Sequence, residues 1–142
     1  MTVIVVLSIF FLDQLSKLIV SNELISGESF PVLENIFHIT LVYNRGAAFG
    51  MLKNQNSLFI FVSLIVIIMI LLILRKRRNV DIFVISLSFI LGGALGNLMD
   101  RILLGYVVDF LDFRIWPVFN LADSAVTIGA FLLCYSVFKK RG

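Results

Sequence analysis

Long uncharged apolar runs constrain the fold of this chain more than any other feature. Three of them extend from Ser57 to Leu74, from Ile82 to Met99 and from Ser124 to Phe138. Each is long enough, or nearly so, to cross about 30 Å of hydrocarbon as a helix. A fourth begins at Thr2 and continues through two charged residues. The 142-residue chain, 60% apolar, is therefore predicted to be one integral membrane domain, residues 1–142, with spans at about 2–20, 57–74, 82–99 and 122–138.

Basic residues indicate the orientation of these spans. Seven of the twelve lie in two clusters that follow the second and fourth spans: Arg75, Lys76, Arg77 and Arg78, then Lys139, Lys140 and Arg141. The positive-inside rule places both clusters, and both termini, in the cytoplasm. The outer segments are then residues 21–56 and 100–121. Because the positive charge flanks spans, nucleic-acid binding is not predicted.

The first outer segment is expected to form a small sheet on the membrane surface. In FPVLENIFHITLVY, the alternating residues Phe37, Ile39, Leu41 and Tyr43 are predicted to line one face of a strand. The strand is closed by NRGAAFG, Asn44 to Gly50, whose Asn and Gly residues favour a turn.

Two polar groups lie within or beside the spans. Asp13 and Lys17 are four residues apart, so they can pair on one helix face, in a structural or a functional role. In GGALGNLMDR, Gly92 to Arg101, small residues permit close helix contact. Asn97, Asp100 and Arg101 follow at the outer end of that helix, as an interfacial anchor or as part of a site.

Three aspartates flank the loop before the last span. Asp123 begins that helix, where a capping role is the simplest interpretation, and Asp112 reads as a solvated loop acid beside Arg114. Two carboxylates brought together would instead share one proton, which is the chemistry of aspartic proteases.

Other classes of function are less well supported by the residues. His38 is the only histidine, which argues against a zinc peptidase and against serine catalysis with a histidine base. A small transporter is a rival class, but the polar groups gather at one face and provide no relay to the cytoplasm. A non-catalytic scaffold would need no paired acids. No metal or cofactor is predicted.

Taken together, five motifs resemble the lipoprotein signal peptidase family, also called signal peptidase II, along nearly the whole chain. They are DQLSK (Asp13–Lys17), NRGAAFG (Asn44–Gly50), GGALGNLMDR (Gly92–Arg101), VVDF (Val107–Phe110) and FNLAD (Phe119–Asp123). The resemblance implies that Asp109 and Asp123 are catalytic. It places Asn44, Gly46, Asn97, Arg101 and Asn120 around the substrate groove, and Asp13, Lys17 and Asp100 as supports.

The same resemblance implies a bacterial cell-membrane aspartic endopeptidase with its active site at the outer face. Its substrates would be prolipoproteins, cut before a cysteine that carries diacylglycerol, and globomycin would inhibit it. The implied fold is mainly α: four transmembrane helices, a small extracytoplasmic β-cradle, and a surface helix in the second outer loop. Membrane lipid is the expected environment, with the chain acting as a monomer.

Overall fold

The computed structural model describes residues 2–46, 55–77 and 79–139. Four helices long and apolar enough to span a membrane lie in it: α1 (Thr2–Glu23), α2 (Asn56–Arg75), α3 (Ile82–Leu103) and α4 (Leu121–Lys139). Three strands, β1 (Ser29–Leu33), β2 (Phe37–Asn44) and β3 (Val107–Asp112), form an antiparallel sheet in the order β1-β2-β3. Helices occupy the four ranges predicted as spans, and each helix is one to four residues longer at one or both ends.

Helix α3 is the centre of the helical part, packed against α1, α2 and α4. Its small residues explain why the contacts are close. A Cβ added at Gly92 would lie 2.9 Å from the Cβ of Ile9 in α1, and one at Gly129 in α4 would lie 2.7 Å from Ile90 of α3. In lipid, where hydrophobic burial does not drive helix association, such close backbone packing supplies much of the attraction.

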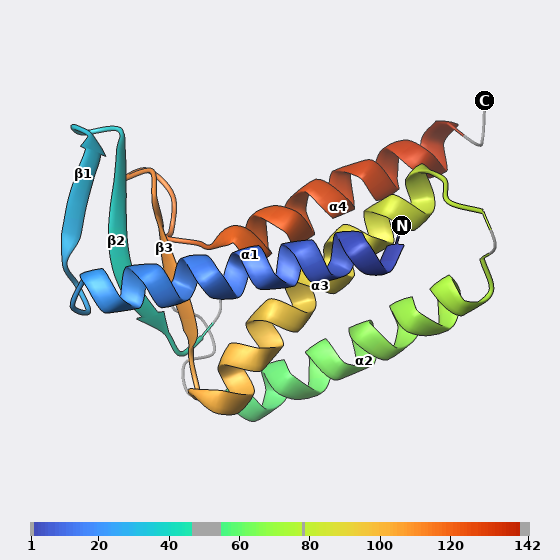
Figure 1. Ribbon diagram of the computed structural model, residues 1–142, viewed down its shortest axis with the longest axis horizontal. Coiled ribbons are helices and arrows are strands. Elements are labelled where there is room, and N and C mark those ends of the chain that lie inside the picture. Colours follow the sequence, from blue (N-terminus) through green and yellow to red (C-terminus); the bar gives the residue numbers. More distant parts are fainter. Residues whose placement is uncertain (1, 47–54, 78, 140–142) are drawn as a thin grey trace.

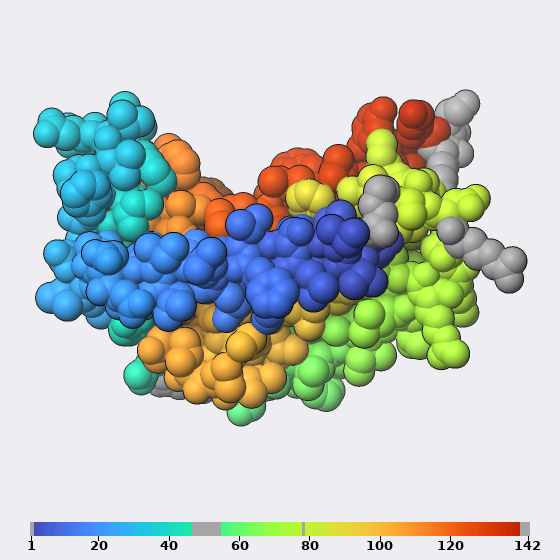
Figure 2. All heavy atoms as spheres, viewed as in Figure 1, coloured from blue at the N-terminus to red at the C-terminus, as the bar shows by residue number. Residues whose placement is uncertain are grey.

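The sheet stands at one end of the helices (Figure 1). The N-terminus, the end of α2 and the end of α4 all lie at the other end, so Arg75 and Lys139 are on the side opposite the sheet. Arg78, Lys140 and Arg141 lie outside the described residues. The molecular outline is concave between the sheet and the far end of α4 (Figure 2).

The second outer loop differs from the prediction, because no surface helix forms between α3 and α4. Residues 104–120 are all described, and they contain β3 and an isolated bridge between Leu111 and Phe119. β-branched and aromatic residues favour a strand here, and β2 supplies its partner. Val107, Val108 and Phe110 are buried, and β3 pairs with β2.

The predicted alternation along β2 is interrupted. Between Ile39 and Val42 the register to β3 shifts, with one extra residue on β2, which is a β-bulge. Leu41 is fully buried, whereas Tyr43 is exposed and its ring lies 4.5 Å from that of Tyr106. The four alternating residues therefore do not form one uniform face. Of the closing motif, Asn44 to Gly46 are described and residues 47–50 lie outside the described part.

Candidate active site

Asp109 lies in the middle of β3, with only 2% of its surface exposed. Its neighbours Val108 and Phe110 are buried too, so the packing of the strand fixes the position of the carboxyl group. Two amides donate to it: Asn44 Nδ2 to Oδ2 at 2.9 Å and Asn120 Nδ2 to Oδ1 at 2.7 Å. The Asp109 carboxyl group is thus held by one hydrogen bond from β2 and one from the residue just before α4.

Asp123 lies in the first turn of α4 and forms a reciprocal cap with Asn120. The Asp123 backbone N–H donates to Asn120 Oδ1 at 2.8 Å, and the Asn120 backbone N–H donates to Asp123 Oδ2 at 3.3 Å. This is the geometry of a capping box. The other oxygen of Asp123 accepts from Asn97 Nδ2 of α3 at 2.8 Å. The simple capping interpretation of Asp123 is therefore incomplete, since Asn120 is the residue that precedes the helix and caps it.

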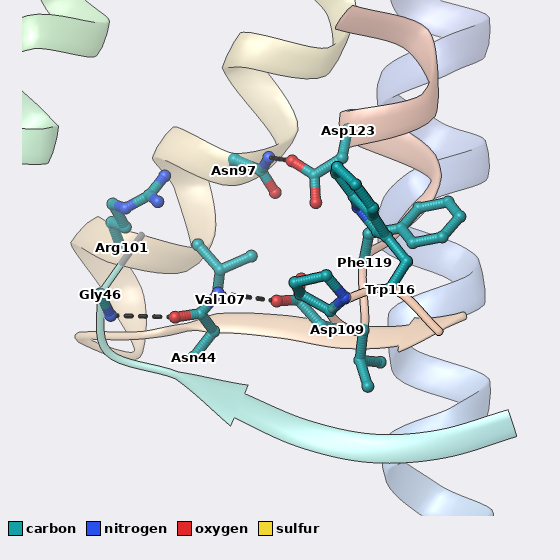
Figure 3. A pocket seen from close by; sticks show the side chains of 11 residues that line it. Asn44, Gly46, Asn97, Arg101, Val107, Asp109, Trp116, Phe119 and Asp123 are labelled. Atoms are coloured by element: carbon teal, nitrogen blue, oxygen red, sulfur yellow. Dashed lines mark hydrogen bonds between the residues drawn. The ribbon is translucent and has the colours of Figure 1, made fainter. Parts of the chain in front are cut away.

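Both carboxyl groups line one cavity of about 210 Å³ (Figure 3). Asp109 enters it from the sheet and Asp123 from α4, and Asn120 contacts both. The rest of the lining comes from four places, the end of β2, the end of α3, the first residue of β3 and the aromatic loop before α4: Asn44, Gly46, Asn97, Arg101, Val107, Trp116, Pro117, Val118 and Phe119. A small substrate group or a water molecule in this cavity would meet both acids.

The surroundings of Asp109 change its protonation. Burial raises the pKa of its carboxyl group from 3.8 to about 7, and the nearby charge of Asp123 adds to the rise. Hydrogen bonds from Asn44 and Asn120 and the charge of Lys17 oppose the rise without cancelling it. At neutral pH this carboxyl group is therefore protonated in a large fraction of molecules.

Behind the cavity, Lys17 of α1 forms a buried ion pair with two acids. Its Nζ lies 2.7 Å from Asp13 Oδ2 and 2.8 Å from Asp100 Oδ2, and all three side chains are at most 4% exposed. Asp13 Oδ1 accepts the Ala122 N–H at 2.9 Å, and Asp100 Oδ2 accepts the Val108 N–H at 3.1 Å. The cluster thus joins α1 and α3 to the residue that directly precedes each of the two cavity acids.

The other predicted substrate-groove residues fall into two groups. Asn44, Gly46, Asn97 and Arg101 line the cavity, and the Arg101 guanidinium lies 5.0 Å from the centre of the Phe59 ring of α2. Asn120 is fully buried and lies beneath the cavity, not in its wall. Its contacts make it a bridge between the acids.

Asp112 is not the solvated loop acid that the sequence suggested. It is the last residue of β3 and is buried. It accepts from Thr40 Oγ1 at 2.7 Å and from Arg114 Nη1 at 3.0 Å. Burial acts to raise the pKa of Asp112, but the hydrogen bonds from Thr40 and Arg114, with the Arg114 charge, outweigh it and lower the pKa. Asp112 is not among the residues that line the cavity, and the acids paired with Lys17 are Asp13 and Asp100.

Sequence reasoning missed two contributors. Gln14 Nε2 donates to Asp100 Oδ1 at 3.0 Å and lies within hydrogen-bond distance of Asp13 Oδ2. Its place inside the DQLSK motif was the available signal. Trp116, 59% exposed, forms part of the cavity wall, and an isolated tryptophan in a loop gave no sign of this. Within the described residues, no group of three or more His, Cys, Asp or Glu side chains is arranged to hold a metal ion.

Fold and site together define a multi-pass membrane protein with two carboxyl groups facing one cavity at the sheet end of its helices. The sequence profile described as Signal peptidase (SPase) II matches residues 5–139. The chain belongs to the signal peptidase II family, as the five motifs indicated.

Individual relatives agree with this assignment. A lipoprotein signal peptidase of Halothermothrix orenii is 53% identical over 141 residues, which cover 99% of this chain and 97% of the relative. One from Caldanaerobacter subterraneus subsp. tengcongensis is 44% identical over 143 residues, covering 100% and 99%. The chain is therefore a peptidase of the family that removes signal peptides from lipoproteins.

Solved structures agree as well. Two that are described as a bacterial membrane enzyme, both 33% identical to this chain, superpose with TM-scores of 0.92 and 0.88. The superposition on the first structure covers 99% of this chain and 89% of the other chain. The superposition on the second covers 97% of this chain and 92% of the other chain. The mainly helical membrane fold with its small sheet is thus shared with known membrane enzymes.

Proposed function

We propose that this protein is an aspartic endopeptidase that cleaves prolipoproteins just before the diacylglyceryl-modified cysteine, with Asp109 and Asp123 as its catalytic pair. The observation that carries the proposal is the shared cavity, which both carboxyl groups line and which Asn120 bridges. Neither a metal nor a cofactor is required, because a carboxylate and a carboxylic acid supply the base and the acid.

The chemistry needs one ionised and one protonated carboxyl group. The ionised member takes a proton from water as the water oxygen attacks the scissile carbonyl carbon, and the protonated member donates to the carbonyl oxygen. The raised pKa of Asp109, about 7, supports such a division at neutral pH. Two ionised acids facing one cavity would repel each other, which further favours a single shared proton.

The position of the cavity suits a substrate that is itself anchored in the membrane. The site lies at the sheet end of the helices, opposite Arg75 and Lys139. By the positive-inside rule that end faces outward and both termini are cytoplasmic, in the bacterial cell membrane. A signal peptide crossing the bilayer as a helix would then present its last residues at the level of the acids.

Parts of the cavity wall match the expected substrate. Trp116 and Phe119 offer apolar surface toward the lipid-modified residue, while Asn44 and Arg101 offer hydrogen-bond donors to its carbonyl oxygens.

The decisive experiment compares Asp109→Asn and Asp123→Asn with Asp112→Asn in cleavage of a purified diacylglyceryl precursor. Both cavity variants should fold, remain in the membrane and lose at least about 10³-fold in kcat, because the acid–base pair is broken. Asp112→Asn should retain most activity, since that side chain contacts Thr40 and Arg114 and not the cavity. Cleavage by the wild type should stop with globomycin, and an unlipidated precursor should be cut poorly. Normal turnover by either cavity variant would reject the catalytic pair.

A further inference from the structure

Three asparagines surround the two acids, and each has its carbonyl oxygen held by a group that can only donate. Asn44 Oδ1 accepts the Gly46 N–H at 2.9 Å, and Asn120 Oδ1 accepts the Asp123 N–H at 2.8 Å. Asn97 Oδ1 accepts from Lys17 Nζ at 3.0 Å. Because these partners cannot accept a hydrogen bond, each amide must turn its NH₂ group toward a carboxyl group.

Lys17 differs from the other two partners, because it is a charged side chain and not a backbone N–H. An ammonium group has three donors, and Lys17 directs them to Asp13, Asp100 and Asn97. The two acids hold the ammonium group from either side, which fixes its position. Its third donor goes to Asn97 Oδ1. The Asn97 NH₂ group in turn donates to Asp123 Oδ1 (Figure 3).

The hydrogen bonds to the two cavity acids are therefore unequal. Asp123 accepts a hydrogen bond from the Asn97 NH₂ group at 2.8 Å. The Lys17 ammonium group, which donates to the carbonyl oxygen of the same amide, polarises this donor. Asp109 receives Asn44, which is held by a neutral N–H, and Asn120, whose Nδ2 also lies near Asn97 Oδ1 and Val108 O. In addition, Asp123 lies in the first turn of α4, where the helix dipole favours negative charge, whereas Asp109 lies in a strand.

We propose that Lys17 is a positioning residue, which orients and polarises the Asn97 amide so that Asp123 is the ionised base and Asp109 carries the shared proton. This inference rests on the proposed function and deepens it, since it assigns each acid its role and adds a residue that does not line the cavity. The ion pair with Asp13 and Asp100 thereby has a catalytic consequence beyond joining the helices.

The assignment gives a balanced cycle. Water adds to the scissile carbonyl carbon as its proton moves to Asp123 and the Asp109 proton moves to the carbonyl oxygen. The C–N bond then breaks while Asp123 passes its proton to the leaving nitrogen, and Asp109 regains a proton from a hydroxyl of the intermediate. The products are a carboxylic acid and the free amine of the modified cysteine, and both aspartates return to their starting states.

The test compares two variants that share one substitution. In Asp100→Asn, Lys17 keeps Asp13 and Asn97 as partners. In the double variant Lys17→Met with Asp100→Asn, the donor to Asn97 is removed, while the formal charge of the Asp13, Lys17 and Asp100 cluster stays as in the wild type. Charged groups that interact with Asp123 in the described chain are Asp109 of β3, Arg101 of α3, and Asp13 and Lys17 of α1. The readouts are thermal unfolding in detergent, globomycin binding, and the pH dependence of kcat/KM.

The double variant should bind globomycin, which shows a folded site, while its kcat/KM falls about 10- to 100-fold below that of Asp100→Asn, as expected for the loss of one hydrogen bond to a charged group. The acid limb of its pH profile should move up by about one pH unit, because the ionised base has lost its polarised donor. KM should change little. A folded double variant with the same kcat/KM and the same acid limb as Asp100→Asn would overturn the inference. If the double variant does not fold, Asn97→Leu is measured in its place. A folded Asn97→Leu enzyme that keeps the acid limb of the wild type would also overturn the inference. Failure of the proposed function itself would look different, as undiminished cleavage by Asp109→Asn or Asp123→Asn.

Discussion

Replacing Gly93 with alanine is expected to damage catalysis more than any other single methyl addition at the α3–α4 contact. An added Cβ would lie 2.9 Å from Val126 Cγ2 and closer still to the backbone carbonyl oxygen of Ala122. The Ala122 backbone cannot yield easily, because it lies in the first turn of α4. Restoring an ordinary contact of 3.4 Å requires the two helices to separate locally by about 1 Å.

That separation falls on the first turn of α4, beside Asp123. The Asn97 Nδ2–Asp123 Oδ1 bond is 2.8 Å and the Ala122 N–Asp13 Oδ1 bond is 2.9 Å. An increase of about 1 Å takes both beyond the usual range of N–H···O bonds. Misplacement of this size typically costs about 100-fold in rate, and overpacking costs about 1–3 kcal/mol of stability.

Gly129→Ala provides the matched control. Its Cβ would lie 2.7 Å from Ile90 Cγ1 and 2.8 Å from the Ser86 carbonyl oxygen, so it too meets a side chain and a backbone carbonyl of the same pair of helices, with less overlap at the carbonyl. It occurs six residues beyond Asp123, away from the cavity. Both variants should unfold at lower temperature than the wild type, and cleavage rates should be compared per folded molecule. Equal activity in the two variants, or a fully active Gly93→Ala enzyme, would refute the argument that helix spacing positions Asp123.

Two further predictions concern pH and helix capping. The pKa of Asp109 is raised to about 7 and the proposed role requires its protonated form, so kcat/KM of the wild type should decline as pH rises through about 7. Asp112→Asn should show the same decline. If kcat/KM did not change between about pH 6 and 8, the assignment of Asp109 as the acid would be contradicted. Asp81 caps α3 by accepting the Val84 N–H at 2.9 Å, so Asp81→Ala should lose about 1 kcal/mol of unfolding free energy, whereas Asp81→Asn should lose little. Denaturant titration of the two variants checks this, and equal losses would show that the cap contributes nothing specific.

The apolar runs and the charge pattern were enough to predict the helical part of the fold. Bilayer thickness sets a minimum length for each span, so helix positions followed from composition with small errors at the ends. The β-branched run of β3 carried a strand signal as well, but the resemblance suggested a surface helix for that loop. The strand forms because β2 provides a partner, a pairing between residues 63 or more positions apart that local sequence does not specify.

For the site, the sequence determined which acids are present, and the tertiary structure decided what each one contacts. Asp112 and Asp109 are three residues apart in one strand, yet one pairs with Arg114 and the other faces the cavity. Asn120 was predicted to lie around the substrate groove, and the structure adds that it is buried and contacts both acids. Motif spacing could not reveal that Lys17 reaches Asn97, eighty positions away, because a hydrogen bond's direction depends on how α1 packs against α3. Chain order therefore supplied the chemical groups, while packing in three dimensions set their orientation, burial and charge.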